Sequence, residues 1–155
     1  MLTIHRTIRS HRLNGLTVEQ KGSTNQWTGT MSKPKILIVD DDADLQEILK
    51  DSFEAEGYFV RTADDGERAL EIIEQNPPDV VVLDFRMPKV NGLEVLKRIK
   101  GVNPGLPVIM ITAYGRELNV SELTKEGMYT LLIKPLDPNR VRMCVEKALE
   151  ERNLI

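Results

Sequence analysis

Cysteine is nearly absent from this 155-residue chain, which contains one, Cys144. The sequence therefore excludes an internal disulfide and a cysteine-based zinc cage. No apolar run approaches the ~20 residues that a transmembrane helix needs. The glycine-rich signatures Gly-x-Gly-x-x-Gly and Gly-x-x-x-x-Gly-Lys-Ser/Thr are both missing, which argues against a dinucleotide site and a P-loop nucleotide site.

Histidine and charge are unevenly distributed. Both histidines, His5 and His11, precede residue 33, so the body of the chain has no histidine base or phosphodonor. Residues 1–32 hold four basic residues and one acid, whereas the whole chain carries a net charge of −3. Residues 33–155 therefore carry −6, and this acidic balance argues against direct binding of nucleic acid there.

The first 32 residues differ in composition from the rest. They are rich in Gly, Ser, Thr, Asn and Gln and show no sustained hydrophobic period or signal-peptide core. We expect a disordered extension, followed by one domain over residues 33–155. The motif Met31-Ser32-Lys33-Pro34 would make a natural start for that domain. A basic, acid-poor segment could also be a transit peptide or a nucleic-acid-binding arm.

From residue 35 the chain alternates between apolar runs and helical periods. We expect helices over about 45–53, 67–75, 93–100, 116–126 and 137–152, with Gly57 just past the first and Asp137-Pro138 opening the last. The strands are expected at 35–39, 58–62, 79–83, 107–111 and 130–133, with the second near an edge. This alternation predicts an α/β fold with a five-stranded parallel sheet and helices on both faces, in the flavodoxin-like order 2-1-3-4-5.

Polar residues follow the carboxyl ends of four strands. Asp40-Asp41-Asp42 follow the first strand and Asp84 follows the third, and these strands are neighbours in the expected order. Two carboxylates ~4 Å apart repel by about 4 kcal/mol at an effective dielectric constant near 20, so a divalent cation such as Mg²⁺ would suit them. Thr112 and Lys134 follow the fourth and fifth strands and could bind a phosphoryl group. Individually, Asp40 or Asp42 could instead cap the next helix, and Thr112 could be a turn residue.

These motifs resemble the signature set of response-regulator receiver domains of two-component signalling. The resemblance covers residues 35 to about 150 and rests on Ile36–Asp42, Asp79–Pro88, Met110–Ala113 and Ile133–Pro135. It implies that Asp84 is the phosphoacceptor and that Lys134 pairs with the phosphoryl group before a cis proline. It also implies that Thr112 binds a phosphoryl oxygen and moves on activation. The implied Mg²⁺ (or Mn²⁺) ligands are Asp41, Asp84 and the Arg86 carbonyl, with Asp40 acting through water.

The resemblance is greatest to single-domain receivers of the sporulation-phosphorelay type, and to receivers attached to enhancer-binding ATPases. It implies a cytoplasmic signalling protein, with no membrane partner and no enzymatic activity beyond its own phosphorylation and dephosphorylation. The expected partners are a sensor histidine kinase or phosphotransfer protein, and an effector that contacts helix 4, strand 5 and helix 5. Alternatives are an interaction module that no longer needs phosphorylation, a fragment of a DNA-binding transcriptional regulator, and an aspartate-based phosphatase. A phosphatase of that type has its Asp-x-Asp motif after strand 1, whereas the nucleophile position here follows strand 3 and Asp84 is followed by Phe85-Arg86.

Three positions depart from the family pattern or vary within it. Leu131 stands where the family usually has the Tyr or Phe that switches with the threonine, and Tyr129 could replace that ring if its strand extends so far. We expect an output surface that is more rigid or switches differently. Arg86 and Tyr114, each two residues past an active-site residue, are large, and we expect them to hinder water and slow dephosphorylation.

Overall fold

The computed structural model describes residues 10–13, 16–19 and 33–155. The chain divides into two compact units, Met1–Lys33 and Pro34–Ile155. In the first unit, strands β1 (Ser10–Leu13) and β2 (Leu16–Glu19) pair in antiparallel fashion, although no period in the sequence predicts a strand there. The expected disorder of residues 1–32 otherwise falls outside the described residues and stays a prediction.

The second unit is built on a parallel sheet whose strand order confirms the prediction 2-1-3-4-5. The order is β4-β3-β5-β6-β7, and all four pairings are parallel. The second, third and fourth strands start one residue later than the sequence suggested. The strands are β3 (Lys35–Val39), β4 (Phe59–Ala63), β5 (Val80–Asp84), β6 (Val108–Thr112) and β7 (Thr130–Ile133).

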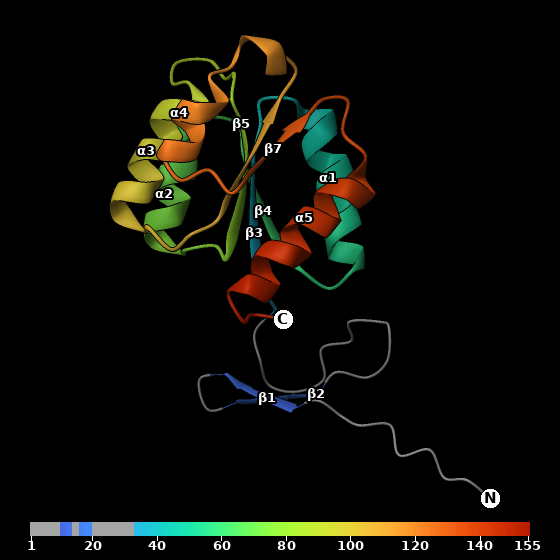
Figure 1. Cartoon of the computed structure of the whole chain (residues 1–155). Coiled ribbons are helices and arrows are strands. Elements are labelled where there is room, and N and C mark those ends of the chain that lie inside the picture. Colours follow the sequence, from blue (N-terminus) through green and yellow to red (C-terminus); the bar gives the residue numbers. More distant parts are fainter. Residues whose placement is uncertain (1–9, 14–15, 20–32) are drawn as a thin grey trace, which may run out of the picture. The chain divides into compact units, whose positions relative to one another are not determined.

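Helices cover both faces of this sheet (Figure 1). α2, α3 and α4 lie on one side, and α1 and α5 lie on the other. Every residue of β5 and β6 is buried, as expected for strands covered on both faces. The helices are α1 (Ala43–Ala55), α2 (Gly66–Gln75), α3 (Gly92–Val102), α4 (Val120–Lys125) and α5 (Pro138–Glu151), and a 3-10 turn, η1 (Gly115–Glu117), precedes α4.

The core therefore consists of two apolar layers separated by the sheet. Alternate residues of each strand point to opposite faces, so Val81 and Leu83 join the α2–α3 layer while Val80 and Val82 join the α1–α5 layer. Burying one such side chain contributes about 1.5–3 kcal/mol relative to leaving it exposed. β5 packs against both layers, so the position of its last residue, Asp84, is fixed from both sides of the sheet.

Polar side chains begin each of the five α-helices. Asp42, Asp65, Asn91, Asn119 and Asp137 each accept a hydrogen bond from a backbone N–H of the first turn, which satisfies donors that have no partner within the helix. The predicted start at Asp137-Pro138 is confirmed. The expected glycine after the first helix is also confirmed, because Gly57 has a φ of 91°.

Two helical expectations are wrong. The segment expected to form one helix over residues 116–126 is interrupted: η1 ends at Glu117, Leu118 is extended, and α4 begins after the cap Asn119. In α1, the helical spacing of Leu45, Ile48, Leu49, Ser52 and Phe53 predicts one shared face, but Ile48 is 53% exposed. Gln46 is buried instead, because Asp40 after β3 and Ala63 and Asp64 at the end of β4 supply hydrogen-bond acceptors for its amide.

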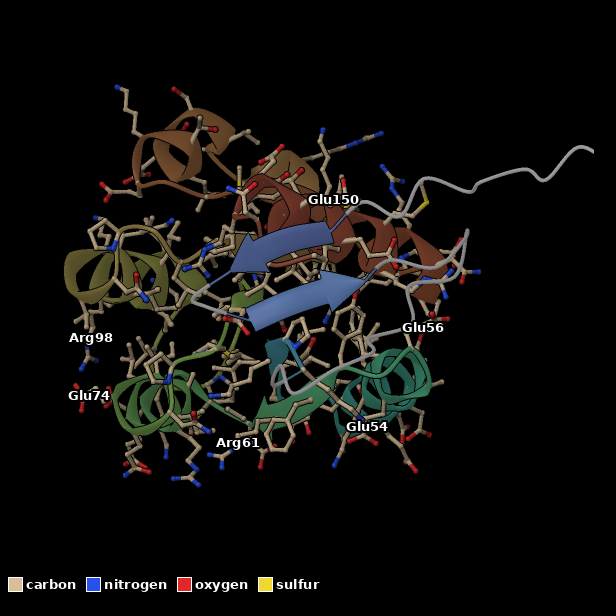
Figure 2. All side chains as sticks on the ribbon, turned by 90° about the horizontal axis from the view of Figure 1, so that it is seen from below. Glu54, Glu56, Arg61, Glu74, Arg98 and Glu150 are labelled. Carbon is tan, nitrogen blue, oxygen red and sulfur yellow. The ribbon has the colours of Figure 1, made fainter. Side chains whose placement is uncertain are left out.

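Charged side chains lie on the outer surfaces of both helical layers. Figure 2 shows Arg98 and Glu74 on the α2–α3 side, and Glu56 and Glu150 on the α1–α5 side. Among the residues that the structure describes, no helix combines the length and the apolar character needed to cross a bilayer.

Candidate functional site

Three carboxylates converge where β3 and β5 end. Asp40 directly follows β3, Asp41 comes next, and Asp84 is the last residue of β5. One carboxylate oxygen from each lies within 4.8 Å of the others. Asp40 and Asp84 are buried, whereas Asp41 is exposed. The topology therefore brings these predicted residues together and leaves one acid at the mouth of the site.

Lys134, directly after β7, supplies the opposite charge. Its Nζ lies 2.9 Å from Oδ2 of Asp40 and 3.4 Å from Oδ2 of Asp84. The peptide bond from Lys134 to Pro135 is cis, as the resemblance implied. The ammonium group thus bridges two buried carboxylates, and its third donor remains available to a ligand.

The electrostatics of the site are unbalanced toward negative charge. Burial, and then the charge of Asp40, raise the pKa of Asp84 to about 6, against the opposing effect of Lys134. Burial lowers the pKa of Lys134, but its hydrogen bond to Asp40 and the charge of Asp84 outweigh this, so the pKa is raised overall. The charged ammonium of Lys134 therefore faces the carboxylate of Asp84, whose ionisation costs free energy at this buried position.

The β3–α1 loop is held by a residue that sequence reasoning missed. Gln46 Nε2 donates hydrogen bonds to the backbone oxygens of Asp40 and Ala63 and to Oδ1 of Asp64. The backbone N–H of Asp42 donates to Oδ1 of Asp40 (2.9 Å). A glutamine on an apolar helix face gave no sequence signal, since a solvated position is the usual one for that residue type.

Asp42 belongs to the helix rather than to the acid cluster. Its Oδ1 accepts hydrogen bonds from the backbone N–H groups of Asp44 (3.0 Å) and Leu45 (3.2 Å), so it is the N-cap of α1. Of the two acids for which a capping role remained open, Asp42 has that role and Asp40 lies in the cluster.

Thr112 ends β6 beside Asp84 in the sheet. It is fully buried, and its residue neighbour Ile111 pairs with Asp84 in the parallel ladder. The Thr112 Oγ1 accepts a hydrogen bond from the backbone N–H of Tyr114 (3.0 Å). The hydroxyl proton is then left to donate elsewhere.

Arg86 and Tyr114, the two large residues expected near the site, touch each other. The Arg86 guanidinium carbon lies 4.1 Å from the centroid of the Tyr114 ring, and Nη2 of Arg86 donates to Oε2 of Glu117 at 2.7 Å. The Arg86 backbone N–H donates to Oδ1 of Asp84 (3.3 Å). Glu117 lay in an expected helix, so the sequence did not indicate this contact.

Gly92, the first residue of α3, lets the helix start against the Asp84 backbone. A Cβ at this position would lie 2.6 Å from Cα of Phe85 and 2.8 Å from the carbonyl oxygen of Asp84. The Gly92 N–H donates to the Phe85 carbonyl (2.7 Å). The sequence does not indicate this close approach, because the approach depends on how the start of α3 packs against the end of β5.

Leu131 and Tyr129 lie on opposite sides of the sheet. Leu131 is half-buried against the α2–α3–α4 layer, whereas Tyr129 packs against the α1–α5 layer. β7 begins at Thr130, as expected, so the condition for a shared face, that the strand reaches Tyr129, is not met. Burial and a hydrogen bond with Glu151 raise the pKa of Tyr129 to about 12.

The acid cluster fits a hard divalent cation. Three carboxylates offer the oxygen ligands that Mg²⁺ prefers, and the exposed Asp41 leaves room for further ligands. Lys134 supplies one positive charge against the two buried carboxylates of Asp40 and Asp84, and burial, followed by the charge of Asp40, raises the pKa of Asp84. A divalent ion would supply the missing positive charge.

Comparison with known proteins agrees with this geometry. A family model described as response regulator receiver domain matches residues 36–146. Sporulation initiation phosphotransferase F of Bacillus subtilis (strain 168) is 41% identical over 120 residues, which cover 77% of this chain and 96% of that protein. Transcriptional regulatory protein ZraR of Escherichia coli (strain K12) is 39% identical over 120 residues, which cover 77% of this chain and 27% of that protein. The chain thus spans about a quarter of the length of ZraR.

Solved structures give the same result. A CheY-like response regulator receiver domain protein from Methanospirillum hungatei JF-1 matches with a TM-score of 0.76 and 30% identity, over 79% of this chain and 98% of that one. The receiver domain of NtrX from Brucella abortus matches with a TM-score of 0.69 and 36% identity, over 74% of this chain and 98% of that one. With its acid cluster, its lysine and its strand order in agreement, the chain belongs to the response regulator receiver domain family.

Proposed function

We propose that Asp84 accepts a phosphoryl group from a phosphohistidine of another protein. A carboxylate oxygen of Asp84 attacks phosphorus, the phosphorus–nitrogen bond breaks, and the imidazole leaves with a proton. The single observation that carries this proposal is the position of Lys134, whose Nζ lies 3.4 Å from Asp84 Oδ2 and 2.9 Å from Asp40 Oδ2. That arrangement suits a group that must bind an incoming anion beside a negatively charged nucleophile.

Asp41, Asp84 and the Arg86 carbonyl would hold Mg²⁺ or Mn²⁺ directly, and Asp40 would act through a water molecule. When bound, the ion neutralises charge on the nucleophile and on the phosphoryl oxygens. The convergence of Asp40, Asp41 and Asp84 within 4.8 Å supports this assignment.

Thr112 and Lys134 would then bind the product. The phosphoryl group adds close to two negative charges at neutral pH, and Lys134 would pair with one of its oxygens. The Thr112 hydroxyl, whose oxygen already accepts from Tyr114 N–H, would donate its proton to another. Movement of Thr112 would carry the β6–α4 loop with it and change the surface formed by α4, β7 and α5, which an effector protein would contact.

Two further assignments concern kinetics and readout. The large side chains of Arg86 and Tyr114 would shield the phosphorus from water and lengthen the lifetime of the phosphorylated form, so replacing both by small residues should shorten it. Leu131, half-buried at the position of the usual aromatic switch, would give a readout through Thr112 without rotation of a ring.

Receiver domains of this family interact with histidine kinases or phosphotransfer proteins and with effector domains. We infer the same partners for this chain, in the cytoplasm and without direct contact to nucleic acid or membrane. The likeness to ZraR, of which the chain covers 27%, favours one alternative, in which the chain acts as the receiver part of a transcriptional regulator. An interaction module that has lost phosphorylation is the other alternative, and the complete set of acids, threonine and lysine disfavours it.

The test is labelling of the full chain by acetyl phosphate with and without Mg²⁺. We expect one phosphoryl group per chain, Mg²⁺-dependent and lost in Asp84→Asn. Asp79→Asn serves as the control, because Asp79 accepts a backbone hydrogen bond from Lys35 at the other end of the sheet (2.7 Å). Absence of label on the folded wild-type chain, or label that survives in Asp84→Asn, would refute the proposal.

A further inference from the structure

A three-residue clamp joins the two loops that flank Asp84. Arg86 lies in the β5–α3 loop. Tyr114 lies 28 residues later, directly before η1, and Glu117 lies 31 residues later, at the end of η1. The Arg86 guanidinium is 4.1 Å from the centre of the Tyr114 ring and 2.7 Å from Glu117 Oε2. One cation is thus held by a ring face and a carboxylate together.

Both ends of the clamp are attached to residues of the acceptor site. The Arg86 N–H donates to Asp84 Oδ1 (3.3 Å), and the Tyr114 N–H donates to Thr112 Oγ1 (3.0 Å). Arg86 thus carries both the guanidinium that the clamp holds and the backbone N–H that donates to the acceptor carboxylate. The clamp therefore joins Arg86 and Tyr114, which lie two residues past the acceptor aspartate and the site threonine.

Glu117 contacts the Arg86 guanidinium through an ion pair. In the described part of the chain, Glu117 is the one carboxylate within 4.0 Å of the Arg86 guanidinium. Both side chains are more than half exposed, so the pair is weak and easily exchanged for another anion. Arginine binds phosphate through two parallel donors as readily as it binds carboxylate, and an anionic phosphodonor is therefore a direct competitor of Glu117.

We propose that Glu117 is a positioning residue that holds Arg86 against Tyr114 and so keeps its guanidinium from binding the incoming phosphodonor at Asp84. This inference rests on the proposed phosphoacceptor function. Removing the carboxylate frees Arg86 to bind phosphoryl oxygens, and the chain then accepts phosphate faster from a small anionic donor. Glu117 acts through Arg86 and does not touch the reacting atoms.

The probe is acetyl phosphate. In the transfer, Asp84 oxygen attacks phosphorus, the bond between phosphorus and the acetyl oxygen breaks, and acetate leaves. With the full chain and Mg²⁺, we expect Glu117→Gln to raise the labelling rate about two- to fivefold, the ratio that corresponds to loss of one exposed ion pair. The gain should shrink as salt is raised, because exposed charges are screened.

The decisive variant pair places Glu117→Gln in an Arg86→Met background. If Glu117 acts through Arg86, the substitution has no effect there. Glu67→Gln is the matched control, because it breaks an ion pair of similar exposure between Glu67 and Arg98 (2.9 Å) and should leave the rate unchanged.

Two results overturn the inference while leaving the proposed function intact. The first is labelling of the wild type with no acceleration in Glu117→Gln. The second is equal acceleration with Arg86 and with Met at position 86, which would mean that Glu117 acts through its charge alone. A wild-type chain that is folded but takes no label from acetyl phosphate would instead refute the phosphoacceptor function, and this inference with it.

Discussion

Lys134 and Asp40, 94 residues apart in the sequence, form an ion pair of 2.9 Å in which the Asp40 side chain is fully buried and that of Lys134 is 23% exposed. Removing one partner of a buried pair leaves the other as an uncompensated charge. In this site the loss of Lys134 would leave two buried carboxylates, Asp40 and Asp84, facing each other. Loss of Lys134 should therefore be costly to the fold, in addition to the role proposed for it in phosphoryl binding.

Lys134→Met should lower the free energy of unfolding by about 2–4 kcal/mol at pH 7 without divalent ions, near the range for breaking a buried pair. Urea unfolding measures this. Lys50→Met is the control, because Lys50 forms a 4.0 Å pair with Glu54 that is almost half exposed and should cost less than ~0.5 kcal/mol. Equal effects of the two substitutions would contradict the prediction.

Asp84→Asn should stabilise the metal-free chain at neutral pH. The pKa of Asp84 is raised from 3.8 to about 6 in the folded chain, so between these values the folded chain holds a proton that the unfolded chain has released. The stability of the wild type that is linked to this group is full below about pH 4 and is lost as pH rises through about 6.

The difference in unfolding free energy between Asp84→Asn and wild type should therefore grow over that window, to on the order of 2 kcal/mol in favour of the variant. Urea unfolding at pH 4, 5, 6 and 7 in a chelator measures it. A difference that is constant with pH, or that favours the wild type increasingly as pH rises, would contradict the assigned direction.

Substitution of Asp41 should weaken metal binding, whereas substitution of Asp42 should lower the stability of the fold. Asp41→Asn removes an exposed carboxylate of the cluster, and we expect at least tenfold weaker Mg²⁺ binding with little change in metal-free stability. Asp42→Ala removes the N-cap of α1 and should cost about 1 kcal/mol with little change in Mg²⁺ affinity. Calorimetric titration and urea unfolding distinguish the two. Weaker Mg²⁺ binding in both variants would indicate that Asp42 also contacts the metal.

Two glycines of α3 should respond in opposite directions to alanine. At Gly92 a Cβ would lie 2.6 Å from the backbone of Phe85, whereas at Gly101 it would meet no atom within 4 Å. Gly92→Ala should destabilise by about 1–3 kcal/mol and slow labelling, since it displaces the Asp84 loop. Gly101→Ala should stabilise by about 0.5–1 kcal/mol. Thermal unfolding of both variants tests the contrast, and a neutral Gly92→Ala would contradict it.

Leu131 should make the readout of phosphorylation independent of an aromatic ring. On addition of a phosphoryl mimic such as beryllofluoride with Mg²⁺, we expect large amide shifts at Thr112 and small ones around Leu131, which is packed against the α2–α3–α4 layer. Two-dimensional amide spectra provide the measurement. Large shifts around Leu131 would show that the strand repacks on activation even without a ring.

The strand order and the acid cluster could be predicted from the sequence because both follow from local signals. Apolar runs marked β5 and β6, and carboxylates stood directly after β3 and at the end of β5. Parallel topology then places those strand ends together. The cap at Asp137 could be predicted for the same reason, since a cap and the helix it starts are neighbours in sequence.

What the sequence did not indicate depends on contacts between distant segments. Gln46 is buried because the loops after β3 and β4 meet over it. Glu117 reaches Arg86 because α4 starts late, at Val120. Tyr129 lies on the other side of the sheet from Leu131, because β7 starts at Thr130 and does not include Tyr129. In each case tertiary packing decides between positions that the local period leaves equivalent.

The three consecutive aspartates after β3 illustrate how position rather than composition determines what a residue does. Asp40 pairs with Lys134, Asp41 is exposed, and Asp42 caps the first turn of α1. Shifting the three aspartates by one residue along the chain would keep their total charge but would give each aspartate a different role. A search for related sites by acidic content would therefore find many false matches, whereas a search that counts residues from the end of the strand would not.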